Sequence, residues 1–275
     1  MIIEWSLVFF TLFAGLAVGT FACVALTEWT GKASEVRMTG AVVVLVTLAA
    51  SGLSSVLHLG HPERIFGALG HPTSGIFMEA LAIGLFGLGV FFYILALRRN
   101  ASAQSRRLVA TISMIPALAL AFAVGDSYVM ASRPAWNTLL LPLLYVASAA
   151  VMGCFATAVL FARFNLAPPE KLKPATVCAL IVQAVLIIAF LIHMAAAPYW
   201  EISRSASRVL YGDLAPLFWV GLVLVGLLIP AFLLQRARKD APPRFASFGL
   251  ACVLMAGVAF RAIMFLVGSG VRHFF

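Results

Sequence analysis

The sequence alternates between long apolar runs and short polar segments. Each run has about the 20 residues that a helix needs to cross ~30 Å of hydrocarbon, whereas transmembrane barrel strands appear as alternating segments of about 10 residues. The pattern therefore predicts an all-α integral membrane protein in which residues 1–275 form a single polytopic membrane domain. The eight predicted transmembrane helices cover residues 5–27, 40–59, 75–97, 107–130, 136–162, 174–198, 213–235 and 245–270.

Most connections between these runs are short, and short connections make consecutive helices antiparallel neighbours. The pattern predicts two four-helix bundles placed side by side. The connections at 60–74 and 199–212 are longer. Gly60 and Pro62 mark the end of the second helix, and Thr73 or Ser74 can cap the start of the third.

The composition supports the membrane assignment, with 63% hydrophobic and only 11% charged residues. A net charge of +9 would suit a nucleic-acid binder, but the basic residues gather at the ends of the apolar runs. Thirteen of the 19 Lys and Arg residues lie in the alternate connections 28–39, 98–107, 163–173 and 235–244, and five lie in the opposite set. The positive-inside rule then predicts that both termini face the periplasm, in a bacterial inner membrane.

A polar segment from His58 to Glu79 interrupts the hydrophobic pattern and repeats Leu-Gly-His-Pro at 59–62 and 69–72. Ionisable side chains within a span are costly and usually functional. Counted along the helices, all those predicted within spans lie toward the outer face, and the inner half contains only weak polar groups such as Gln183. The five ionisable side chains predicted at this outer level are His58, Glu79, Asp126, His193 and Arg261.

A pocket with these groups suits a quinone head group, whose oxygens accept hydrogen bonds and whose hydroxyls lose protons on oxidation. Glu79 is the candidate proton acceptor, because a carboxylate near apolar groups can take up a proton and release it outward. His58 would bind one quinone oxygen, and Arg261 would form an ion pair with Glu79 or polarise the other end of the ring. Asp126 and His193 are further candidates for binding quinol.

Simpler interpretations remain for each residue. His58 and Asp126 can reach the headgroup region, His193 can be a packing residue, and Glu79 with Arg261 can form a purely structural salt bridge. The four cysteines, Cys23, Cys154, Cys178 and Cys252, occur singly in different runs, so they predict neither a zinc site nor an iron–sulfur cluster in this chain.

Three other functional classes compete with the quinol site. A b-type cytochrome anchor would need facing histidine ligands, and His58 with His193 supplies at most one pair. A secondary transporter would show matching broken helices in its two halves, but Pro116, Pro142 and Pro230 do not recur in that way. The third alternative is a structural anchor without a quinol site.

These features resemble the membrane anchor subunits of bacterial dimethyl sulfoxide reductases, within the wider class of molybdopterin oxidoreductase anchors. The resemblance lies in FFTLFAGLAVGTFACVAL in the first helix, LHLGHPERIFGAL after the second, Glu79 in the third, and the last-helix Arg261 before Gly-Ser-Gly. Gly257 stands where such anchors carry an acid one turn before that arginine. Anchors of the polysulfide or thiosulfate reductase type are similar.

The resemblance implies a complex with a molybdopterin catalytic subunit and a four-cluster, ferredoxin-like iron–sulfur subunit. The anchor would oxidise menaquinol, with Glu79 and His58 implicated, and the complex would reduce dimethyl sulfoxide or a related S- or N-oxide. The loop with His61, Glu63, Arg64 and His71 is the predicted docking site for the iron–sulfur subunit. Because no ionisable relay is predicted in the inner half, turnover should be electroneutral.

Overall fold

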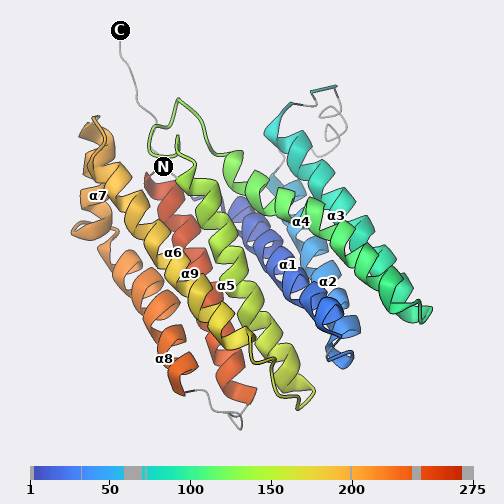
Figure 1. The fold of residues 1–275 in the computed structure, drawn as a ribbon. Coiled ribbons are helices and arrows are strands. Elements are labelled where there is room, and N and C mark those ends of the chain that lie inside the picture. Colours follow the sequence, from blue (N-terminus) through green and yellow to red (C-terminus); the bar gives the residue numbers. More distant parts are fainter. Residues whose placement is uncertain are drawn as a thin grey trace.

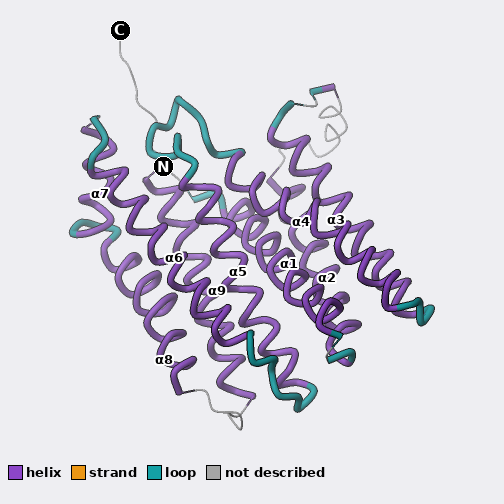
Figure 2. Tube along the Cα trace, in the orientation of Figure 1, coloured by secondary structure: helices purple, strands orange, loops and turns teal. Residues whose placement is uncertain are grey.

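The structure is a computed structural model that describes residues 3–31, 33–58, 70–71, 73–198, 200–236 and 243–267. All regular secondary structure in these ranges is helical. The long helices have similar directions and pack against one another in one bundle (Figures 1 and 2). Eight helical segments are long and apolar enough to cross a membrane, which confirms the predicted number of spans. The helices are α1 (Trp5–Thr30), α2 (Glu35–His58), α3 (Gly75–Arg98), α4 (Ala103–Asp126), α5 (Leu140–Arg163), α6 (Leu172–Ala195), α7 (Trp200–Leu210), η2 (Leu217–Leu228), α8 (Ile229–Arg236) and α9 (Pro243–Val267).

Helix ends differ from the predicted ranges where charged residues belong to the helix and not to the loop. Ser102 caps α4 by accepting a hydrogen bond from the Ser105 backbone N–H at 3.1 Å, so the helix begins before Arg106. Likewise α2 begins at Glu35. Ser74 caps α3 as the sequence predicts, with its hydroxyl oxygen 3.2 Å from the Phe77 nitrogen. Charges therefore mark the ends of spans only to within about a turn of helix.

The structure has two helical features that the sequence analysis did not predict. The connection predicted at 199–212 contains the amphipathic helix α7, which buries Ile202, Ala206 and Val209 and contacts α6, η2 and α9. The seventh span begins with π-helical turns in η2 before it continues as α8. Glycines on η2 pack against alanines of α9: a Cβ on Gly221 would lie 3.0 Å from Ala259.

Helices α1 and α5 form the centre of the molecule. Within the most apolar stretch of each, 72% of residues are buried, against 22% in α3, whose side chains mostly face outward. Helices α1 to α4 pack in a closed circuit, and α5, α6, α8, η2 and α9 pack together beside them. The contact of α1 with α5 joins the two groups, as Figure 1 shows.

Small residues bring α1 and α5 into backbone contact. Gly15 and Gly19 on α1 face Ala149 and Gly153 on α5, so each helix presents small residues at a spacing of four. A Cβ on Gly19 would overlap the Ala149 carbonyl, and one on Gly153 would overlap the Gly19 backbone. Such small-residue surfaces allow the close packing that drives helix association within a bilayer.

Replacing Gly19 with leucine should therefore disrupt the protein, because the backbone of α5 cannot move away without separating the two groups of helices. We expect a loss of at least about 3 kcal/mol, at the upper end of overpacking effects. The measurement is the melting temperature and monodispersity of the purified protein in detergent. Gly84→Leu is the matched control, since no atom lies within 4 Å of a Cβ at that position; equal effects of the two variants would contradict the importance of this contact.

Candidate functional site

Arg261 is completely buried, with 0% of its surface exposed, between α9, α1 and α5. Its Nε donates to Thr11 Oγ1 at 2.7 Å, its Nη2 to the Thr11 carbonyl at 3.0 Å, and its Nη1 to the Gly257 carbonyl at 3.0 Å. The guanidinium carbon lies 5.0 Å from the centre of the Tyr145 ring. The Cβ position of Gly15 lies 3.5 Å from Nη2, which is an ordinary contact distance, so Gly15 of α1 packs directly against this cation.

Glu79 lies one turn into α3 and is half-buried. The Ser127 hydroxyl, just after the end of α4, donates a hydrogen bond to Glu79 Oε1 at 2.6 Å. Gly75 permits this approach, because a Cβ there would lie 3.0 Å from the Ser127 Cβ. Sequence reasoning missed the role of Ser127, although it directly follows Asp126.

The predicted ion pair between Glu79 and Arg261 is wrong. Glu79 bonds to Ser127, whereas Arg261 bonds to Thr11 and Gly257, and no salt bridge joins the two side chains. The reason lies in the packing: α3 packs against α2 and α4 at the side of the molecule, while α9 packs against α5 and α1. The carboxylate and the guanidinium therefore belong to different helix groups.

An aromatic cluster lies between these two polar groups. Tyr128 stacks on Tyr145, with ring centres 6.1 Å apart and planes inclined by 17°, and meets the edges of Trp136 and Phe265. Trp136 Nε1 donates to the Met264 carbonyl at 2.9 Å, which ties the α4–α5 connection to α9. Burial raises the pKa of Tyr128 well above its usual range, with the neighbouring Tyr145 and Glu79 adding to the effect, so Tyr128 stays protonated as a hydrogen-bond donor.

The other predicted site residues are dispersed. Asp126 is exposed at the end of α4, next to Ser127. His193 is half-buried on α6, which packs against α5, α7 and α8, and its Nε2 has no hydrogen-bond partner among the described residues. His71 is exposed, and its carbonyl accepts the Ser74 N–H.

Four of the predicted positions lie wholly or partly outside the described residues. The backbone of His58 forms the last residue of α2, but its side chain is outside the description. His61, Glu63 and Arg64 of the predicted docking loop are also outside it.

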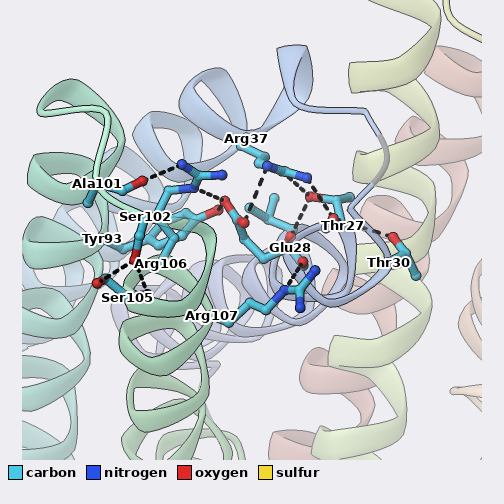
Figure 3. Close-up of polar contacts among 11 residues, drawn as sticks. Thr27, Glu28, Thr30, Arg37, Tyr93, Ala101, Ser102, Ser105, Arg106 and Arg107 are labelled. Atoms are coloured by element: carbon cyan, nitrogen blue, oxygen red, sulfur yellow. Dashed lines mark hydrogen bonds and ion pairs between the residues drawn. The ribbon is translucent and has the colours of Figure 1, made fainter.

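The half of the molecule that the charge distribution predicts to be the inner one contains a buried ionic cluster, contrary to the sequence-based expectation. Glu28, near the end of α1, is 1% exposed and forms salt bridges with Arg37 at 3.3 Å and Arg106 at 3.1 Å. The Tyr93 hydroxyl donates to Glu28 Oε1 at 3.0 Å, so side chains from α1, α2, α3 and α4 meet here (Figure 3). The prediction failed because it assigned Glu28 to a loop, whereas α1 continues to Thr30.

An apolar cavity in the second helix group is too small for a quinone ring. It encloses about 20 Å³, room for roughly one water molecule, between α5, α6, η2 and α9. Its lining is entirely apolar and includes Leu144, Phe190 and Phe260. The groups with acid–base chemistry lie elsewhere.

We expect Glu28→Gln to destabilise the protein strongly, because Arg37 and Arg106 would lose their buried counter-charge. Breaking a buried ion pair typically costs about 3–5 kcal/mol. The melting temperature of the purified protein measures the effect. Glu35→Gln, at an exposed position of α2, is the control and should change stability by no more than ~0.5 kcal/mol. Equal melting temperatures for the two variants would show that the cluster contributes little.

Comparison with known proteins shows the family of this chain. Residues 1–269 match the family model described as DMSO reductase anchor subunit (DmsC). The C subunit of the anaerobic dimethyl sulfoxide reductase of Haemophilus influenzae is 28% identical over 142 residues, which cover 50% of this protein and 51% of the relative. The aligned part thus spans about half of the curated relative, while the family model covers nearly the whole sequence. This multi-pass membrane protein belongs to the DMSO reductase anchor subunit family (DmsC).

Proposed function

We propose that this protein oxidises menaquinol near the periplasmic face and passes the electrons to an iron–sulfur subunit. A molybdopterin subunit of the same complex would then reduce dimethyl sulfoxide or a related S- or N-oxide. Family membership supports the anchor role. The observation that carries the quinol site is Glu79, a half-buried carboxylate at the outer end of α3 that holds one hydrogen bond from Ser127 and no ion pair among the described residues.

A carboxylate in that setting can act as a base. An arginine partner would hold it in the charged form, whereas a single hydroxyl donor leaves its second oxygen available for a quinol hydroxyl. Oxidation of one quinol releases two electrons and two protons and leaves the quinone. In this proposal Glu79 accepts the proton of one quinol hydroxyl and releases it toward the nearby periplasm. The other hydroxyl is bound by His58, at the outer end of α2, and its proton leaves on the same side.

Arg261 has a less direct role in this proposal than the sequence suggested. Its N–H groups are directed at Thr11 and Gly257 within the protein. Its guanidinium carbon lies 5.0 Å from the centre of the Tyr145 ring, and its bonds to Thr11 join α9 to α1. Asp126, exposed beside Ser127, would receive the proton on its way to the surface.

The proposed orientation places both termini in the periplasm, on the basis of the uneven distribution of Lys and Arg. The contacts between helices support an arrangement of two four-helix bundles joined through α1 and α5. The iron–sulfur subunit would dock on the periplasmic loops, including the segment with His61, Glu63, Arg64 and the exposed His71. Both termini, the quinol site and the partner would then lie on the same side of the membrane.

Turnover is proposed to be electroneutral, because protons and electrons leave on the same side. The inner cluster at Glu28 does not provide a relay from Glu79. Tyr93, which bonds Glu28, lies 14 residues beyond Glu79 on α3, or about 21 Å along the helix. The buried side chains of α3 between them are apolar, namely Ala82, Phe86 and Val90.

A b-type haem held by His58 and His193 is less well supported. Axial ligands must come from facing helices. Helix α2 packs against α1, α3 and α5, whereas α6 packs against α5, α7 and α8.

Glu79→Gln tests the proposed function most simply. We expect at least about a 100-fold loss of menaquinol-driven oxide reduction, since general-base catalysis contributes roughly 10²–10⁴-fold. Reduction driven by an artificial donor that feeds the catalytic subunit directly should be unchanged. Glu170→Gln, at an exposed loop position, is the matched control; a fully active Glu79→Gln complex would refute the proposal.

Ser127→Ala tests the positioning of the carboxylate. Loss of a hydrogen bond to a charged group costs about 1.5–3 kcal/mol, so kcat with menaquinol should fall about ten-fold or more while KM changes little. Ser127→Thr keeps the hydroxyl and should restore most of the activity. If both variants lose activity equally, Ser127 contributes only to packing.

A further inference from the structure

We infer that the inner end of the α1–α4 seam binds the phosphate of an anionic phospholipid through Arg107. Arg107 lies on α4, and its side chain is exposed. Its Nε donates to the Glu28 carbonyl at 2.9 Å, which fixes the guanidinium beneath the last turn of α1 (Figure 3). No hydrogen bond from its two Nη groups occurs within the described part of the protein.

The charge of Arg107 is not neutralised by its acidic neighbour. The Glu28 carboxylate is occupied by Arg37, Arg106 and Tyr93, and only its backbone carbonyl contacts Arg107. A guanidinium with free Nη groups presents two parallel N–H donors, the geometry that matches two oxygens of a phosphate. The site therefore has a guanidinium that is held in place through Nε, and its two Nη groups are available to bind a ligand.

The surroundings favour a lipid over a free phosphate ion. Trp29 is 46% exposed beside Arg107, and its indole N–H donates to Thr111 Oγ1 at 3.2 Å, one turn further along α4. Leu26 and Leu108 are 50% and 60% exposed on the same two helices. An oriented tryptophan next to exposed leucines is typical of the membrane interface, where a headgroup meets its acyl chains.

Gly31 lies next to the guanidinium of Arg107. Gly31 ends α1 with a φ of 70°, in the left-handed region, and a Cβ there would lie 3.9 Å from Arg107 Nη2. The positive-inside count directs this end of the molecule to the cytoplasmic leaflet, where anionic lipids attract basic residues by about 1 kcal/mol each. The inference is independent of the proposed quinol chemistry.

The test compares Arg107→Gln with Arg99→Gln, which removes the same charge from an exposed arginine at the end of α3. The purified complex in zwitterionic phosphatidylcholine nanodiscs is compared with the same complex in nanodiscs of rising phosphatidylglycerol content, and the melting temperature is followed. Arg107→Gln should raise the phosphatidylglycerol fraction needed for half-maximal stabilisation about five-fold, the equivalent of ~1 kcal/mol. Arg99→Gln should shift it clearly less, because it removes only the general attraction of a charge to the anionic surface.

Arg107 also satisfies a carbonyl at the end of α1, and the loss of that bond would lower the melting temperature equally in both lipids. Only the dependence on phosphatidylglycerol reports the binding site. If Arg107→Gln fails to assemble, Arg107→Lys replaces it, since lysine keeps a donor for the carbonyl but loses the paired N–H geometry. Equal responses of the two glutamine variants, no response of the wild-type protein, or equal stabilisation by inorganic phosphate would overturn the inference.

Discussion

The backbone contact between α1 and α5 at Gly19 and Gly153 is the constraint on which the rest of the structure depends. Within a bilayer the hydrophobic effect does not draw helices together, so association rests on close packing and on polar contacts. The contact fixes α1 between the two helix groups. From that position α1 supplies Thr11 to Arg261 in its N-terminal half and Glu28 to Arg37 and Arg106 at its C-terminal end.

The two ends of α1 therefore differ in chemistry. At the C-terminal end the carboxylate of Glu28 is buried and forms salt bridges with two arginines, which suits a structural junction of four helices. Toward the N-terminal end Arg261 is bound by neutral oxygens and Glu79 by one hydroxyl. Glu79 has no cationic partner among the described residues and is only half-buried, so it can interact with a substrate, and for this reason we propose the quinol site at Glu79.

Hydropathy and charge predicted the eight spans, and the Pro-Thr-Ser sequence predicted the Ser74 cap of α3, because these features depend on local composition. The partners of Glu79 and Arg261 could not be predicted, since they depend on which helices pack together. Glu28 was misassigned because charge was used to end the helix; a carboxylate at the edge of a strongly basic face was itself a sign of buried ion pairs. The aromatic contacts of Tyr128 likewise follow from tertiary packing alone.

Photolabelling can determine directly whether quinol binds at the N-terminal end of α3, as proposed. The purified complex would be irradiated with an azido-quinone, and the labelled peptides identified by mass spectrometry. We expect labels on the first turns of α3 and on the segment that begins at Ser127, and competition by menaquinol should remove them. Labels confined to the inner end of α1 and α4, or to α6 and η2, would contradict the proposal.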